Sequence, residues 1–120
     1  MTAVLRFAVV ILALLAVPPA AFGHAFLAKA SPPVGSRVPA SPAELALRFS
    51  EGVEPLFCTV ELLNHAGAAI GVPAPRLVGD GDVLIVTLPE LPPGVYTVVW
   101  HVTSVDTHKT EGRFQFTVGP

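Results

Sequence analysis

The sequence predicts an all-β domain, either a small immunoglobulin-like sandwich or a barrel, from three observations. No segment after residue 23 combines a sustained helical period with helix caps. Eleven of the 13 prolines and nine of the ten glycines also lie after residue 23, where they interrupt the chain too often for long helices. Between these breaks the chain shows short runs in which apolar and polar residues alternate, as half-buried strands do.

About seven strands follow from these runs. In residues 44–50, Leu45, Leu47 and Phe49 share one face. The turn Pro92-Pro93-Gly94 leads into the longest run, in which every second residue from Tyr96 to Val102 points the same way. The expected strands are residues 25–30, 44–50, 57–63, 68–72, 82–88, 95–103 and 113–118, and the expected aromatic core is Phe49, Trp100, Phe114 and Phe116.

The first 23 residues are expected to form a cleaved export signal. The whole chain is 52% hydrophobic, and 18 of these 23 residues are hydrophobic. Arg6 precedes an apolar run of 11 residues (7–17), too short to span a bilayer, which takes about 20 residues. Small residues at positions 21 and 23 favour cleavage after Gly23, which would leave an exported mature domain of residues 24–120. An uncleaved anchor, or cleavage after residue 20 or 21, is the alternative.

Charge and motifs exclude several functions. The formal net charge is −2, and no basic patch indicates nucleic acid or an anionic membrane as a partner. Cys58 is the single cysteine, so no internal disulfide can form, and its apolar surroundings predict a buried, inert thiol. No nucleophile elbow or phosphate-binding loop is present. Glu51 and Glu54 fit a solvated turn better than a glycosidase pair.

Three residues predict a metal site. After cleavage, His24 would carry two nitrogen donors, the α-amine and the imidazole. Asp106 and His108 stand two positions apart, a spacing that puts both side chains on one side of an extended chain. This nitrogen-rich set with one carboxylate oxygen suits Cu(II) in a tetragonal geometry.

Each histidine and aspartate considered as a ligand also has an explanation that involves no metal. An N-terminal histidine can be an accident of processing, and Asp106 can simply form an Asx turn in a polar loop. His65 falls in an expected hairpin turn, and His101 on the strand face opposite to Trp100, so both are expected at the surface.

The mature sequence resembles the CopC-like periplasmic copper-binding proteins along essentially all of residues 24–120. Six segments carry the resemblance in order: 24–27 (HAFL), 31–36 (SPPVGS), 47–54 (LRFSEGVE), 91–100 (LPPGVYTVVW), 104–108 (SVDTH) and 112–118 (GRFQFTV).

This resemblance implies a Greek-key β-barrel or sandwich that binds Cu(II) through His24, Asp106 and His108. It places Glu51 near the site, as a supporting residue or weak ligand. Many relatives begin His-Ala-His, whereas Phe26 stands at the third position here. Some relatives carry methionines for Cu(I); the only methionine here is Met1, so a Cu(II) site without thioether ligands is expected.

The function expected from this family is that of an exported, non-enzymatic monomer that sequesters or carries copper for homeostasis or resistance. A membrane copper importer would then be a separate chain. Two alternatives remain: a copper enzyme of the histidine-brace type, and a metal-free immunoglobulin-like interaction module.

Overall fold

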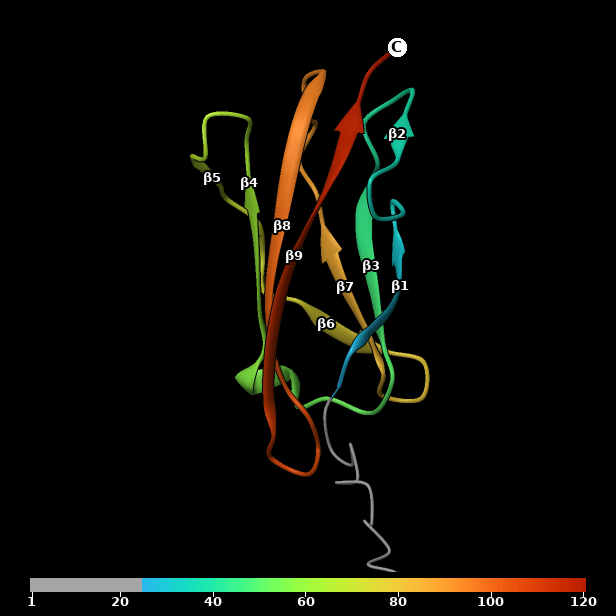
Figure 1. Cartoon of the computed structure of the whole chain (residues 1–120), viewed down its shortest axis with the longest axis vertical. Coiled ribbons are helices and arrows are strands. Elements are labelled where there is room, and N and C mark those ends of the chain that lie inside the picture. Colours follow the sequence, from blue (N-terminus) through green and yellow to red (C-terminus); the bar gives the residue numbers. More distant parts are fainter. Residues whose placement is uncertain (1–24) are drawn as a thin grey trace, which may run out of the picture.

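The computed structural model describes residues 25–120, which form a sandwich of two β-sheets (Figure 1). One sheet has the strand order β1-β3-β7-β6, and the other has the order β2-β9-β8-β4-β5. The elements are β1 (Leu27–Ser31), β2 (Arg37–Val38), β3 (Glu44–Phe49), the 3₁₀ helix η1 (Pro55–Phe57), β4 (Thr59–Leu63), β5 (Ala69–Ile70), β6 (Arg76–Val78), β7 (Val83–Thr87), β8 (Gly94–Thr103) and β9 (Lys109–Val118).

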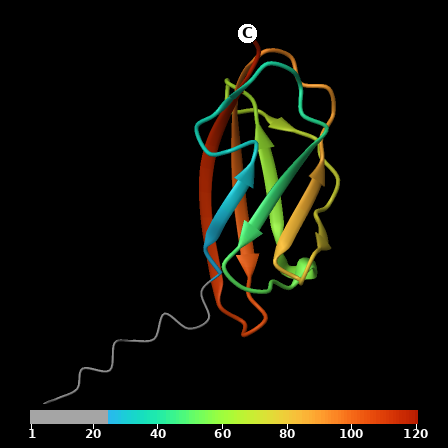
Figure 2. The ribbon, with the colours of Figure 1, turned by 90° about the vertical axis from the view of Figure 1, so that its right-hand side faces the viewer.

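The chain passes repeatedly from one sheet to the other. After β1 it crosses to β2, returns to β3, crosses again to β4 and β5, returns to β6 and β7, and ends in β8 and β9. The strand pairs are antiparallel except β2 with β9. This arrangement, which Figure 2 shows with the sheet of β1, β3 and β7 in front of the other sheet, confirms the all-β, immunoglobulin-like sandwich that the sequence predicts.

The core lies between the sheets and contains the residues that the alternation predicts. Phe49 and Phe116 are each 1% exposed, and Phe114 and Trp100 are also buried. The Phe49 ring of β3 meets the Trp100 ring of β8 edge to face, with 5.2 Å between centroids. This aromatic contact joins the two sheets directly and buries a large apolar area.

The β8–β9 hairpin contributes the longest continuous pairing, ten residue pairs from Gly94↔Val118 to Thr103↔Lys109. In this register Gly112 lies opposite Trp100. A Cβ placed on Gly112 would come within 2.5 Å of the indole Cζ2 atom, so the absence of a side chain at position 112 makes room for the ring.

The strand predictions differ from the structure in three places. Strands β2 and β6 were missed, since two or three residues are too few to show alternation. Phe57 was expected in a strand but belongs to η1, where Pro55 starts the helix, and its side chain is 68% exposed. The last strand begins at Lys109 rather than at residue 113, because polar residues and Gly112 mask the strand pattern there.

The fold places several segments at one end of the sandwich. Figures 1 and 2 show η1, the turn between β8 and β9 and the start of the described chain at the lower end, and the C-terminus at the upper end. The predicted signal peptide, residues 1–23, and His24 lie outside the described residues. Within residues 25–120, no helix has the length and apolar character needed to cross a membrane.

A test of this packing is the substitution Gly112→Ala. The new methyl group would collide with the Trp100 indole, and we expect the free energy of unfolding to fall by about 1–3 kcal/mol, the usual cost of an overpacked core. Gly71→Ala is the matched control, because a Cβ at Gly71 meets nothing within 4 Å. Urea denaturation followed by tryptophan fluorescence measures both, and equal stabilities would contradict the packing.

Candidate metal centre

The turn between β8 and β9 carries two of the predicted ligands. Because Thr103 pairs with Lys109, residues 104–108 must reverse the chain. The turn is closed by two backbone hydrogen bonds: Ser104 N–H donates to the His108 carbonyl (2.9 Å), and Thr107 N–H donates to the Ser104 carbonyl (2.8 Å). Thr107 adopts a φ of 75°, a left-handed conformation that is uncommon outside glycine.

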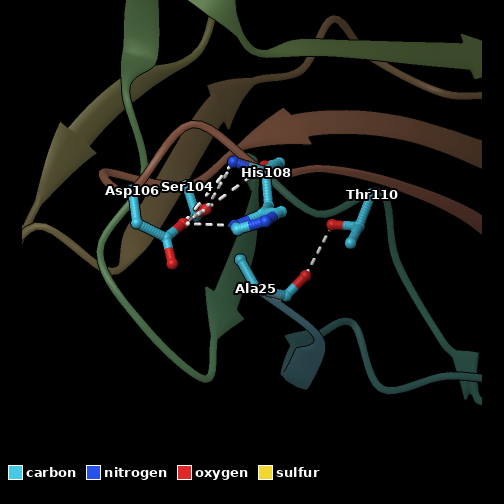
Figure 3. Close-up of polar contacts among 5 residues, drawn as sticks. All are labelled: Ala25, Ser104, Asp106, His108 and Thr110. Atoms are coloured by element: carbon cyan, nitrogen blue, oxygen red, sulfur yellow. Dashed lines mark hydrogen bonds and ion pairs between the residues drawn. The ribbon is translucent and has the colours of Figure 1, made fainter. Parts of the chain in front are cut away.

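Asp106 and His108 point toward one another across this turn (Figure 3). The His108 Nδ1 atom lies 3.2 Å from Asp106 Oδ1, and the two side chains are 52% and 42% exposed. The sequence predicted this convergence from an extended chain, but the tight turn produces it instead. Two cis ligands at bond lengths of about 2.0–2.1 Å are about 2.8–3.0 Å apart, so the observed pair fits a shared metal ion with little movement.

Ser104 sets the electrostatics of the Asp106 carboxylate. Its hydroxyl is fully buried and donates a hydrogen bond to Asp106 Oδ1. This hydrogen bond holds the pKa of Asp106 below its ordinary value, and hydrogen bonds and charge interaction from His108 act in the same direction. Asp106 is therefore an ionised carboxylate, the form that binds metal, well into the acidic range.

The chain enters the domain beside this turn. Ala25 is fully buried, and its carbonyl accepts a 2.6 Å hydrogen bond from the Thr110 hydroxyl, two residues after His108 (Figure 3). Phe26 is held as well: its N–H donates to Ser50 Oγ (2.9 Å), and its carbonyl accepts from Ser50 N–H (2.8 Å). The start of the described chain is thus fixed between β9 and the segment that follows β3.

Glu51 lies in a segment that borders both of these features. Its neighbour Ser50 pairs with Phe26, and the next residue, Gly52, accepts a 3.0 Å hydrogen bond from Val105 N–H within the turn. The Glu51 Oε1 atom is buried and has no hydrogen-bond partner among the described residues. A buried carboxylate oxygen without a partner is costly, and a nearby cation would relieve that cost.

Within residues 25–120, no group of three or more histidine, cysteine, aspartate or glutamate side chains is arranged to hold a metal ion. The described domain brings Asp106 and His108 together, and a backbone hydrogen bond from Val105 to Gly52 joins their turn to the segment that contains Glu51. The third predicted ligand, His24, precedes Ala25 and lies outside the described residues.

The explanations that involve no metal can also be compared with the structure. His108 N–H lies 3.5 Å from Asp106 Oδ1, an Asx-type contact at the limit of a hydrogen bond, so a polar turn and a ligand pair are compatible here. His65 and His101 are exposed, as predicted, and His101 Nε2 contacts Glu111 Oε2 across the outer sheet surface at 2.9 Å.

Cys58 is buried, as expected, and its thiol donates to the Glu54 carbonyl at 3.1 Å. Burial raises the pKa of this thiol, which keeps it protonated and inert.

Two residues that support the candidate centre were missed at the sequence level, Ser104 and Thr110. Their hydroxyls act through contacts that depend on the β8–β9 register and on the position of Ala25. A serine two residues before an aspartate is a weak signal by itself, since such pairs are common in ordinary turns.

Comparison with known proteins gives consistent matches along the described domain. The family model of the CopC domain matches residues 27–119. Protein YobA of Escherichia coli (strain K12) is 42% identical over 116 residues, which cover 95% of this chain and 94% of YobA.

Two solved structures share the fold. CopC from Methylosinus trichosporium OB3b superposes with a TM-score of 0.77 at 38% identity, covering 81% of this chain and 95% of that protein. PcoC from Escherichia coli, described as a methionine-rich copper resistance protein, superposes with a TM-score of 0.72 at 30% identity, covering 79% of this chain and 98% of PcoC. The chain therefore belongs to the CopC domain family.

Proposed function

We propose that this protein binds Cu(II) through His24, Asp106 and His108 and sequesters or carries copper in the periplasm. The observation that carries the proposal is the 3.2 Å approach of His108 Nδ1 to Asp106 Oδ1, beside the point where the chain enters the domain. PcoC, a structural relative at 30% identity, is described as a copper resistance protein, which supports copper as the metal.

The proposed donor set combines three nitrogens with one oxygen. As the first residue of a processed chain, His24 would supply its α-amine and imidazole nitrogens, which chelate one ion through a ring that includes the backbone. His108 adds a second imidazole, and Asp106 adds a carboxylate oxygen. Such tetragonal nitrogen and oxygen sets suit Cu(II), which lies at the top of the divalent affinity order.

The position of Ala25 supports the participation of residue 24. Consecutive Cα atoms are about 3.8 Å apart, and the Ala25 carbonyl is bonded to Thr110, on the strand that begins directly after His108. A residue joined to Ala25 is therefore within reach of the turn. Glu51, whose Oε1 atom has no hydrogen-bond partner within residues 25–120, would support the site from the adjoining segment.

The donor chemistry favours Cu(II) over Cu(I) and binding over catalysis. Soft thioether or thiolate ligands stabilise Cu(I). The only methionine of this chain is Met1, in contrast to the methionine-rich PcoC, and the Cys58 thiol is buried and protonated. A carboxylate ligand stabilises Cu(II), whereas an oxygen-activating enzyme must reach Cu(I). We therefore propose a copper carrier that acts as a monomer and passes its ion to a separate membrane importer.

The first test is the mass of the exported protein. Cleavage after Gly23 would give a chain that begins at His24, and intact-mass spectrometry of the protein from a periplasmic extract should match residues 24–120. A mature chain that begins at any other residue would contradict the proposed amine ligand.

The second test addresses His24 directly in the mature protein. We expect His24→Ala, or a single glycine added before His24, to weaken Cu(II) binding by more than the roughly 10–100-fold that loss of a supporting residue costs. The glycine extension keeps the imidazole but turns the His24 amine into a peptide nitrogen, so the two-nitrogen chelate of a terminal histidine is lost. Competition titration measures both, with His65→Ala as the control, because His65 lies in the exposed turn between β4 and β5. Unchanged affinity in the His24 variants would refute the site.

The third test is the pH dependence of binding. Unperturbed α-amines and imidazoles take up protons near pH values of about 7.7–8.0 and 6.5, so protons compete with copper for all three nitrogens as the pH falls. Asp106 stays ionised in this range because its pKa is lowered. We expect the Cu(II) affinity to fall by at least about tenfold from pH 7 to pH 5. A constant affinity over this range would argue against nitrogen ligation.

A further inference from the structure

Ser104 is buried directly next to the proposed copper ligands Asp106 and His108. It directly follows β8, forms an isolated antiparallel bridge with Val53, and is 0% exposed. A polar side chain is rarely buried to this extent without hydrogen bonds, because an unsatisfied hydroxyl costs free energy. The contacts of this hydroxyl therefore show what it does.

The Ser104 hydroxyl contacts both residues that carry the proposed ligands. Its O–H donates to Asp106 Oδ1, and its oxygen accepts a 3.2 Å hydrogen bond from His108 N–H. The same oxygen lies 3.2 Å from the His108 carbonyl. One buried atom thus links the side chain of Asp106 to the backbone of His108, as Figure 3 shows.

These contacts also distinguish the two oxygens of the Asp106 carboxylate. Within residues 25–120, each hydrogen bond that Asp106 makes ends on Oδ1. Oδ2 accepts none of these hydrogen bonds. A carboxylate held through one oxygen cannot rotate freely, so the entropic cost of ordering the ligand is met when the protein folds.

Resting on the copper site proposed above, we infer that Ser104 is a positioning residue: its hydroxyl holds the Asp106 carboxylate in place for Cu(II). The backbone bonds of the turn do not depend on this hydroxyl, since Ser104 N–H and the Ser104 carbonyl make their own hydrogen bonds to His108 and Thr107. Removing the hydroxyl should therefore free the carboxylate without opening the turn.

The experiment compares Ser104→Ala with the wild-type mature protein. We expect Ser104→Ala to lower the Cu(II) affinity by about 10–100-fold, the range seen when a partner of a metal ligand is lost. The electron paramagnetic resonance spectrum of the Cu(II) form should change as well, because the carboxylate coordinates differently. In the copper-free protein, the His108 amide proton should exchange faster with solvent, since the nearer of its two acceptors is gone.

Thr103→Val is the matched control. Thr103 is also buried and directly precedes Ser104, and its hydroxyl donates to the Phe57 carbonyl at 3.2 Å without contacting Asp106 or His108. Thr103→Val therefore removes one buried hydroxyl from the same place, and we expect it to keep the copper affinity and spectrum of the wild type.

A double-mutant cycle with Asp106→Ala decides whether Ser104 acts through the carboxylate. If it does, Ser104→Ala should weaken copper binding by no more than about threefold once Asp106 is already alanine. An equal loss in both backgrounds, or an unchanged affinity and spectrum in the single variant, would overturn the inference. A wild-type protein that binds no Cu(II) would refute the proposed function itself, and this inference with it.

Discussion

The pairing of β8 with β9 is the constraint on which the candidate centre depends. Ten consecutive residue pairs fix Thr103 opposite Lys109, so the chain has only residues 104–108 in which to turn. The register cannot slip by one residue without moving Trp100 and Phe114 out of the core, because side chains alternate between the two faces of a strand. The close approach of Asp106 to His108 thus follows from the burial of side chains farther along the same hairpin.

The contact between the two sheets supplies the second half of the arrangement. The Phe49 ring packs on Trp100. Directly after Phe49 the chain leaves β3 and runs beside the turn between β8 and β9. Backbone hydrogen bonds then join Gly52 to Val105 and Ser50 to Phe26. Three segments far apart in sequence consequently meet at one end of the sandwich. A metal ion bound there would link the start of the domain to its last hairpin, and ligation would stabilise the folded state.

The chemistry of this end suits a site that is organised before the metal arrives. The Asp106 carboxylate is ionised and held by a buried hydroxyl, and the His108 backbone is bonded to the same hydroxyl. The Asp106 and His108 side chains remain about half exposed, which would leave a bound ion open to exchange with a partner. Rigid support combined with open access is what a copper carrier needs, since it must both bind and release its cargo.

The sequence alone determined the sandwich, most of its strands and its aromatic core, because alternation and turn residues are local signals that burial enforces directly. It also singled out Asp106 and His108, through their spacing and a family resemblance. The short strands β2 and β6, the 3₁₀ helix at Phe57 and the early start of β9 required the tertiary structure, since pairing with neighbours overrides weak local patterns there. The supporting contacts were likewise decided only in three dimensions. The turn at Thr107, the hydroxyl of Ser104 beneath the carboxylate and the bond from Thr110 to Ala25 join residues whose proximity depends on strand register and on packing between the sheets.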